Sequence, residues 1–375
     1  PEQTLRDFDL PPRRDALRDV HFPPDMECAE RARRRLAFEE FLCMQLVLVA
    51  RKIQAERFLD GAVHAAGGAL ARRMVEALPF ELTEAQNRVI REIRGDLIRP
   101  RPMHRLLQGD VGSGKTVVAA CAVLDAVETG AQAVLMAPTE ILARQHAVTF
   151  GRLLEPLGID VALLTGDARE RHRREILAGL KSGRLKMAVG THGVFQDRVN
   201  FHDLGLVIID EQHKFGVEQR GLLYGKGTHP DVLVMTATPI PRTLSMTVYG
   251  DLDVSVIDEL PAGRRPVVTR VVSEAQLEEA YAFIVQQVRR GRQAFLVYPL
   301  VAESEALELK SAEEMYRTLS EGPLGSVRMG LLHGQMKPEE KNAVMQSFRN
   351  GAVDVLAATT VVEVGVDVPN ATVML

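Results

Sequence analysis

The sequence predicts an α/β protein built from two parallel-sheet domains. From about residue 79 onward, short apolar runs alternate with helical stretches, the pattern of strands linked by helices. Residues 109–116 read Gly-Asp-Val-Gly-Ser-Gly-Lys-Thr, which fits the phosphate-loop pattern G-x-x-x-x-G-K-[ST]. Asp210 and Glu211 follow a later apolar run, where a buried strand would meet solvent. A length of 375 residues suits two or three domains.

The composition is that of a soluble globular protein, with 46% hydrophobic and 26% charged residues. The net charge of −4 does not indicate a generally basic surface, although a local basic groove remains compatible with it. Cys28, Cys43 and Cys121 have no metal-ligand spacing, which favours a reducing compartment without disulfides or a zinc site. The longest apolar stretch, 41–50, is too short to span a bilayer, and no signal peptide is visible.

The first part of the chain is predicted to be a helical segment ahead of the sheets. Residues 1–24 are rich in Pro and Arg and are expected to be irregular. From Asp25 to Ala65 the pattern is helical, because apolar residues recur at spacings of three and four: Phe38, Leu42, Leu46, Val49 and Ile53. We expect a scaffold helix that packs on the next domain, with the basic run 31–35 on a solvated face.

The first sheet is predicted between about residues 79 and 250. A helix from Gly114 to Glu128 follows the phosphate loop and stops at Gly130, so phosphates would meet a helix N-terminus. Thr83 is a credible N-cap for a helix that runs to about Arg94. The expected strands are 105–108, 133–137, 160–164, 186–190, 206–210 and 232–236.

Residues 258–266 are polar and turn-rich and are predicted to be an interdomain linker. After it we expect helices at 274–290 and 338–349, and strands at 267–272, 294–299, 327–332, 353–357 and 372–375. This second domain has no phosphate loop of its own. No repeat of 20–50 residues is visible, and the two halves are expected to share a pattern of elements but not residues.

The phosphate loop and the carboxylate pair together predict a nucleoside triphosphatase. The loop residues Gly109, Asp110, Val111, Gly112, Ser113, Gly114, Lys115 and Thr116 would bind phosphates, with the glycines allowing close backbone approach. Lys115 would reach the β- and γ-phosphates, and the Thr116 hydroxyl would hold Mg²⁺. Asp210 would hold the same Mg²⁺ and Glu211 would orient the attacking water.

Other candidates are weaker when taken alone. Gln86, with Phe80 nearby, could bind an adenine edge, although a helical Gln is usually solvated. Gln212 and His213 could report the nucleotide state, and the segment with Thr236, Thr238 and Arg242 could couple the nucleotide to a track. Their ordinary interpretations are a structural histidine and a loop that ends a strand.

Six strings carry a specific resemblance, which runs from about Ala16 to the last residue: 108–116, 137–146, 189–196, 208–217, 235–243 and 358–371. The chain resembles superfamily 2 helicases, which have two RecA-like domains with ATP between them, and more narrowly the RecG family of bacterial branch-migration helicases. Transcription–repair coupling translocases share Thr-Ala-Thr-Pro-Ile-Pro-Arg-Thr but carry Asp-Glu-Glu-Gln in place of 210–213. Replication-restart helicases carry a cysteine-rich zinc insertion that is not seen here.

The resemblance implies ATP and Mg²⁺ as cofactors, branched or duplex DNA as the partner, a monomer, and a bacterial cytoplasmic, nucleoid-associated location. It implies a linker segment at 1–77, an ATP-binding domain at 78–257 and a second RecA-like domain at 267–375. Glu363, Gly365 and Asp367 would sense the nucleotide. The DNA track would include Thr139, Arg144, Gln145, Thr165, Gly166, Thr191, His192, His333, Gly334, Thr359 and Thr360.

The resemblance also implies segments outside this chain. A wedge domain would precede Pro1, and an arginine-bearing segment would follow Leu375, which would leave the second domain incomplete. Because loss of such an arginine slows turnover by about 10³- to 10⁵-fold, we expect this chain to bind nucleotide but hydrolyse it slowly. The alternatives are a translocase of the transcription–repair coupling type, a nucleotide-gated DNA-binding module and an RNA helicase.

Overall fold

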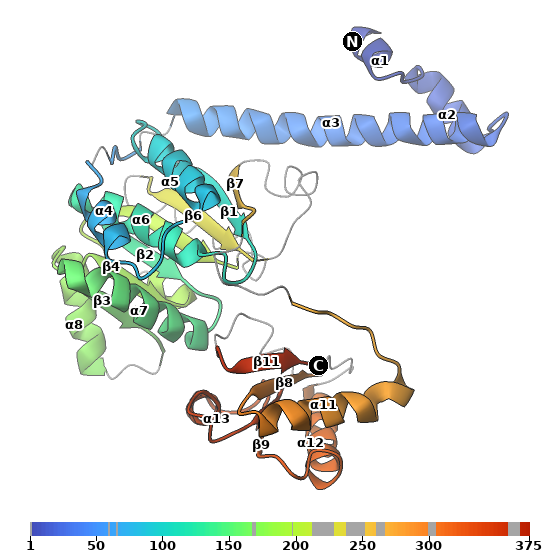
Figure 1. Ribbon diagram of the computed structural model, residues 1–375. Coiled ribbons are helices and arrows are strands. Elements are labelled where there is room, and N and C mark those ends of the chain that lie inside the picture. The colour runs from blue at the N-terminus through green and yellow to red at the C-terminus, as the bar shows by residue number, and fades with distance from the viewer. Residues whose placement is uncertain are drawn as a thin grey trace. The chain divides into compact units, whose positions relative to one another are not determined.

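The computed structural model describes residues 2–58, 61–64, 67–166, 170–196, 198–211, 229–237, 252–259, 267–298, 305–358 and 368–375. The chain divides into two compact units, Pro1–Pro138 with Phe150–Pro261, and Thr139–Thr149 with Ala262–Leu375. Each unit contains one parallel sheet, and helices precede the first sheet (Figure 1). The predicted fold class is therefore confirmed.

Three helices form the start of the chain: α1 (Glu2–Asp7), α2 (Arg13–His21) and α3 (Met26–Phe58). The prediction that residues 1–24 are irregular is wrong, because the prolines lie at helix ends and not inside helices. Pro12 is the N-cap of α2, a position that needs no N–H donor. No helix among the described residues, α3 included, is long and apolar enough to cross a membrane.

The first sheet has seven parallel strands in the order β3-β4-β2-β5-β6-β1-β7. Their bounds are β1 His104–Gly109, β2 Gln132–Met136, β3 Val161–Leu164, β4 Met187–Gly190, β5 Leu204–Asp210, β6 Asp231–Thr236 and β7 Asp253–Ile257. The six predicted strands are all present within about two residues. Strand β7 was not predicted, because Ser255 interrupts its apolar residues, as suits an edge strand.

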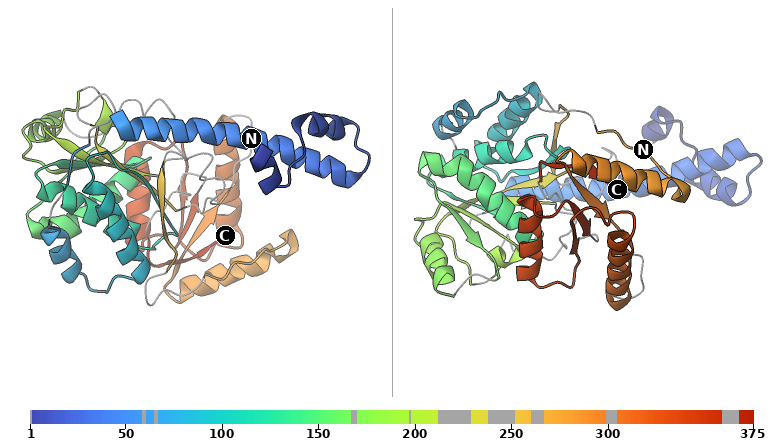
Figure 2. Two further views of the ribbon diagram at one scale, coloured as in Figure 1. Left: turned by 90° about the horizontal axis from the view of Figure 1, so that it is seen from above. Right: turned by 60° about the horizontal axis from the view of Figure 1, so that its bottom comes forward.

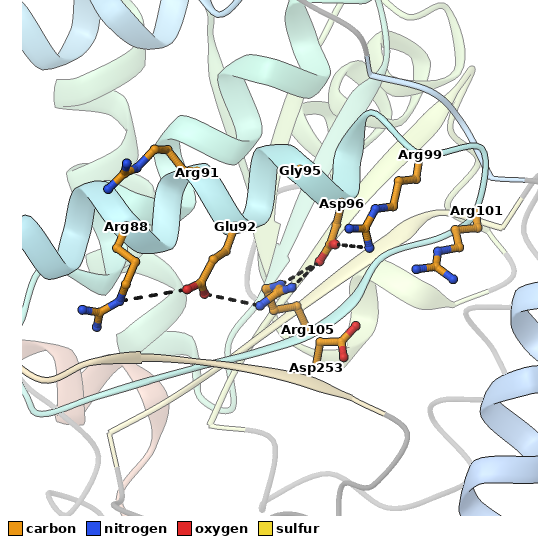
Figure 3. A pocket seen from close by; sticks show the side chains of 9 residues that line it. All are labelled: Arg88, Arg91, Glu92, Gly95, Asp96, Arg99, Arg101, Arg105 and Asp253. Atoms are coloured by element: carbon orange, nitrogen blue, oxygen red, sulfur yellow. Dashed lines mark hydrogen bonds and ion pairs between the residues drawn. The ribbon is translucent and has the colours of Figure 1, made fainter.

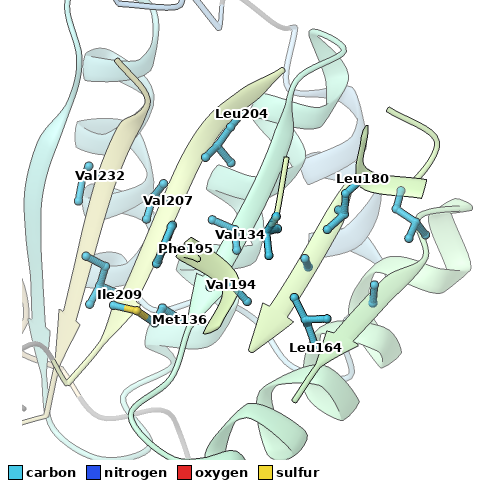
Figure 4. Close-up of a cluster of buried hydrophobic side chains, with 14 of the residues drawn as sticks. Val134, Met136, Leu164, Leu180, Val194, Phe195, Leu204, Val207, Ile209 and Val232 are labelled. Carbon is cyan, nitrogen blue, oxygen red and sulfur yellow. The ribbon is translucent and has the colours of Figure 1, made fainter. Parts of the chain in front are cut away.

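Helices α4 Ala69–Glu76 and α5 Glu84–Leu97 precede β1, and α6 Lys115–Glu128 follows it. After β2 come α7 Glu140–Leu154 and η1 Glu155–Leu157, after β3 comes α8 Glu170–Lys181, and after β4 comes η2 His192–Phe195. Most of α7 belongs to the second unit. Alternate strand residues, among them Val134, Val207 and Val232, form one apolar cluster with Leu180 of α8 (Figure 4). The intervening strand residues face the other side of the sheet, where α6 packs. The sheet is thus buried on both faces.

The second sheet has four parallel strands in the order β11-β8-β10-β9. The strands are β8 Gln293–Val297, β9 Met329–Leu332, β10 Val355–Ala358 and β11 Ala371–Met374, and the helices are η4 Glu274–Gln276, α11 Leu277–Arg289, α12 Glu305–Glu321 and α13 Pro338–Arg349. Phe348 of α13 packs on one face, while Ile284 of α11 and Leu319 of α12 pack on the other. Figure 2 shows the helices of this unit, in orange to red, around its strands. Helix α12 was not predicted.

The predicted strand at 267–272 is wrong. These residues form no ladder, and Val267, Val268 and Val271 are 82%, 77% and 99% exposed. The β-branched composition is typical of a strand, but a strand forms only where a neighbouring edge supplies hydrogen bonds. The sheet of the second unit offers no described strand that pairs with this segment.

The expectation that the two halves share no residues is also wrong, because one buried glutamine occurs at the same place in both sheets. At the start of β2 the Gln132 amide donates to the carbonyls of Leu180 and Leu185, at 2.9 and 2.6 Å. At the start of β8 the Gln293 amide donates to the carbonyls of Phe348 and Val353, at 2.5 and 2.8 Å. Each glutamine therefore bridges the two ends of a helix-to-strand loop: the loop between α8 and β4 in the first sheet, and the loop between α13 and β10 in the second.

Candidate nucleotide and nucleic-acid edge

The parallel topology places the candidate site residues of the first unit along one edge of the sheet. All carboxyl ends of parallel strands meet at the same edge, which is where open α/β sheets bind ligands. Strands β5, β6 and β1 are neighbours and lead to the carboxylates, to Thr236 and to the phosphate loop. Strands β2, β4 and β3 are neighbours and lead to the predicted track residues. The edge thus has a nucleotide half and a track half.

The phosphate loop connects β1 directly to α6. Gly112 and Gly114 have φ values of 75° and 88°, so the loop uses the left-handed region that favours glycine. The Lys115 ammonium donates to the carbonyls of Gly109 and Asp110, at 2.7 and 3.0 Å. Lys115 is the first residue of α6, so its side chain and the free N–H groups of the helix terminus belong to one site. The loop therefore has the geometry of an anion site.

Gln86 connects α5 to this loop. Thr83 caps α5 in a reciprocal capping box with Gln86, which confirms the predicted N-cap. The buried Gln86 amide donates to the Ser113 carbonyl at 2.8 Å, and a Cβ at Gly114 would lie 2.3 Å from its nitrogen. One N–H and one lone pair of the amide remain for a ligand, so adenine binding by Gln86 stays a prediction. Phe80, before the cap, is 49% exposed.

The two carboxylates differ in their surroundings. Asp210 ends β5 and is 9% exposed, whereas Glu211 lies just beyond the strand with φ of 52°, a conformation uncommon for a residue other than glycine. The Glu211 carboxylate accepts hydrogen bonds from the Ala237 N–H at 3.0 Å and from the Thr236 hydroxyl at 3.5 Å. The Glu211 N–H donates to the Met235 carbonyl at 2.9 Å. Hydrogen bonds therefore hold the Glu211 carboxylate at the end of β6.

The track residues of the first sheet follow three adjacent strands. Thr139 caps α7 three residues after β2, with its carbonyl accepting from the Ala143 N–H at 2.9 Å. Thr165 and Gly166 follow β3, and Thr191 and His192 follow β4, where Thr191 caps η2. Arg144 and Gln145 lie in the first two turns of α7. The predicted track residues are thus brought to one stretch of the sheet edge by topology, although their sequence positions span more than fifty residues.

In the second unit, His333 and Gly334 follow β9 at the carboxyl end of that unit's sheet. Lys341 of α13 donates to the Gly334 carbonyl and holds this turn against the helix. The remaining predicted site residues lie outside the described residues: Gln212, His213, Thr238, Arg242, Thr359, Thr360, Glu363, Gly365 and Asp367. Their roles stay predictions.

The residues present fit a magnesium ion that is shared with a bound phosphate. Magnesium usually takes only one or two carboxylates and keeps water and phosphate oxygens as its other ligands. Thr116 in the first turn of α6 and Asp210 at the end of β5 supply one hydroxyl and one carboxylate. Among the described residues no group of three His, Cys, Asp or Glu side chains could hold a metal by itself.

Sequence reasoning missed two contacts that connect the site. One is the Ala237 N–H that binds Glu211, and the other is the Ser113 carbonyl that binds Gln86. Both partners are backbone groups, which every residue type carries. The only sequence signal was indirect. Gln86 on a helix and Glu211 after a strand both have polar side chains, which need a hydrogen-bond partner when they are buried.

Fold and site together define the motor core of a superfamily 2 helicase, and two family models support this class. The model for DEAD/DEAH box helicases matches residues 83–247, and the model for the helicase conserved C-terminal domain matches residues 275–375. A yeast Dbp5 structure with RNA and ADP BeF3 is similar at a TM-score of 0.60 but only 18% identity, which shows the fold alone.

The chain belongs to the RecG family. It is 48% identical over its whole length to the ATP-dependent DNA helicase RecG of Thermotoga maritima and 47% identical to that of Bacillus subtilis, covering 48% and 55% of those proteins. A structure of RecG bound to a three-way DNA junction matches with a TM-score of 0.83 and 45% identity, over all of this chain and 49% of that one. The chain spans about half the length of the curated relatives it matches.

Proposed function

We propose that this chain is the ATP-driven motor of a DNA translocase that acts on branched DNA in recombination and repair. The observation that carries the proposal is the hydrogen bond from Ala237 to Glu211, because it connects the carboxylate that follows β5 to the end of β6, the strand next to β1 and its phosphate loop. The relatives support the substrate, since they are named ATP-dependent DNA helicases and one was solved on a three-way junction. They are bacterial, which supports a cytoplasmic, nucleoid-associated location.

The residues of the nucleotide half divide the chemistry among them. ATP supplies the bond whose hydrolysis provides the free energy. Lys115, now held by two loop carbonyls, would turn to the phosphates, while Thr116 and Asp210 would hold Mg²⁺. Glu211 would orient the attacking water. Any movement of its carboxylate changes the hydrogen bonds to Thr236 and Ala237, so the state of the nucleotide would reach the segment after β6.

The track half would hold DNA without sequence preference. Its hydroxyls, backbone amides and the Arg144 guanidinium suit phosphate oxygens, and contacts to phosphate carry no sequence information. Binding should therefore weaken as salt increases, because phosphate contacts release counterions. We propose domain boundaries at 78–257 and 267–375, a linker at 258–266 and a helical segment at 1–77. In this proposal the monomer is the active form, and binding and release of nucleotide alternate the grip of the two domains.

The test is steady-state ATP turnover and DNA binding by this chain with no nucleic acid, linear duplex, a three-way junction or RNA. We expect the slow turnover of this chain to be highest with the junction and to disappear in the Lys115→Ala variant, while the RNA sample resembles the sample without nucleic acid. Junction-independent turnover, or turnover that survives Lys115→Ala, would refute the proposal. Bound nucleotide and bound DNA with turnover near zero in every sample would favour the nucleotide-gated binding module.

A further inference from the structure

A hollow of about 670 Å³ lies over α5 and the start of edge strand β7, and its lining is almost entirely charged (Figure 3). Its residues are Arg88, Arg91, Glu92, Gly95, Asp96, Arg99, Arg101, Arg105 and Asp253. Five arginines and three carboxylates leave an excess of two positive charges, 5 − 3, on a chain whose net charge is −4. Arg105 and Asp253 lie at the amino ends of β1 and β7, whereas Arg88 at the other end of the hollow pairs with Asp258, just beyond the carboxyl end of β7.

The floor of the hollow is electrostatically compensated. Arg105 is 9% exposed, and its guanidinium lies 2.6 Å from the carboxylate of Asp96 and 3.5 Å from that of Glu92. Arg105 also donates to the Ser255 hydroxyl at 2.7 Å, which fixes α5 to β7. Two rim arginines are paired as well, Arg88 with Asp258 at 2.8 Å and Arg99 with Asp96 at 3.0 Å. Both guanidinium groups are nearly half exposed, so exchanging these carboxylates for phosphate would cost little free energy.

The rim residues are spaced along one side of α5 and its C-terminal turn. Arg88, Arg91, Gly95 and Arg99 are separated by three, four and four residues, the spacing of a single helix face. At 1.5 Å per residue this stripe is about 16 Å long. One DNA strand advances 3.4 Å per nucleotide, so the stripe matches about five phosphates. Nothing lies within 4 Å of a Cβ placed on Gly95, so the middle of the stripe is open.

We propose that this α5 arginine hollow binds the phosphodiester backbone of duplex DNA, as a second contact surface separate from the track half of the sheet edge. The inference rests on the proposed function, since it requires DNA to be the partner. Guanidinium groups bind phosphate in a bidentate manner and keep their charge at any physiological pH. The lining contains no apolar side chain, whereas a docked protein segment would need an apolar anchor, so a nucleic-acid backbone fits the hollow better.

The experiment measures affinity for a duplex and for a three-way junction between about 50 and 200 mM salt. The test variant is Arg91→Ala with Arg101→Ala, which leaves the pairs of Arg105 with Asp96 and Glu92 in place. The charge-matched control is Arg171→Ala with Arg174→Ala on α8, where both side chains are exposed. A second variant, Arg91→Lys with Arg101→Lys, keeps the charge. Binding of a fluorescent ATP analogue checks that the nucleotide half is intact.

We expect the alanine variant to lose about tenfold or more in affinity near 100 mM salt, and its log K against log salt slope to become shallower by about 1 to 2. The lysine variant should keep most of the slope, and the α8 control should match the parent. If the parent binds DNA and the alanine variant has the same salt slope as the parent, the proposal that the hollow binds DNA is refuted, while the proposed function still stands. A parent that binds no DNA would overturn both.

Discussion

A buried histidine–carboxyl pair gives the first unit a specific dependence of stability on pH. Asp231, the first residue of β6, is 1% exposed, and one of its oxygens accepts the Met103 N–H at 2.5 Å. Its other oxygen lies 3.3 Å from the Nε2 atom of His64, which is 3% exposed. The Nδ1 atom of His64 lies 2.8 Å from the Thr129 hydroxyl. Because that hydroxyl donates to Ala126, the Nδ1 atom is the donor and Nε2 is free to accept from a neutral Asp231.

Burial raises the pKa of Asp231 from 3.8 to about 8 and lowers the pKa of His64 from 6.5. The folded state therefore holds the carboxyl proton that the unfolded state releases, and this contribution to stability is lost as pH rises towards 8. The neutral His64 acts in the opposite direction below pH 6.5, where the unfolded state binds an extra proton. The two effects oppose one another at acid pH, and only the loss from Asp231 remains above pH 7.

The perturbation is Asp231→Asn, which keeps an acceptor for Met103 and supplies an N–H for His64. With a folded pKa of about 8, the parent should lose about 1 kcal/mol of unfolding free energy between pH 7 and 9 through this carboxyl. The variant should lose none of it, so the difference between the two proteins should change by about 1 kcal/mol over that range.

The assay is urea unfolding at pH 6, 7, 8 and 9, followed by circular dichroism because the chain contains no tryptophan. Groups other than Asp231 titrate alike in both proteins and cancel in the difference. Asp160→Asn, at an exposed position, is the matched control and should run parallel to the parent. If the difference between Asp231→Asn and the parent stays constant from pH 7 to 9, the raised pKa and the neutral pair are refuted.

Three further predictions concern the site and the core. Glu211→Gln should slow ATP turnover by about 10²- to 10⁴-fold and leave nucleotide affinity nearly unchanged, as measured by turnover beside equilibrium binding; unchanged turnover would remove Glu211 from catalysis. Gly114→Ala should abolish nucleotide binding because its Cβ would meet Gln86 at 2.3 Å, whereas Gly130→Ala, with a φ of 96° and open space, should cost only about 1 kcal/mol of stability. Gln132→Ala removes the side-chain partner of the Leu185 carbonyl and of the Asp203 N–H, and should cost about 2–5 kcal/mol in urea unfolding. A loss below about 1 kcal/mol would contradict the role of the amide.

Sequence periodicity predicted those parts of the fold that are buried on both faces. The run from Leu206 to Ile209 is continuously apolar because β5 lies inside a parallel sheet, and its strand was correctly predicted. Strand β7 at the edge was missed because its polar Ser255 finds partners only in the folded protein, where it accepts from Arg105, 150 residues away in the sequence, and donates to Glu92. For 267–272 the error is the opposite one: a strand was predicted where none forms. Its valines favour a strand, but a strand also needs a neighbouring strand to pair with.

The same limit applies to the site. A phosphate loop constrains contiguous residues to one backbone path, so residues 109–116 could be assigned from the string alone. The bond between Glu211 and Ala237 depends on β5 and β6 being neighbours in register, Asp210 opposite Met235, and this register is a property of the folded sheet. Sequence reasoning could name Glu211 and Thr236 as candidates, but the contact that couples them required the topology.

Gln132 and Gln293 occupy matching positions in the two sheets. Gln132 and Gln293 each follow a glycine of positive φ by two residues, Gly130 at 96° and Gly291 at 78°. The loops they close have equal length, 180–185 and 348–353, and each turns at a glycine with φ of 73°. A buried amide needs partners for its N–H and carbonyl groups. In each sheet a glutamine at the start of a strand finds them at the two ends of a helix-to-strand loop. That agreement in detail, between units of which one has the phosphate loop and the other has none, is what duplication of an ancestral sheet followed by divergence of its ligand edge would leave.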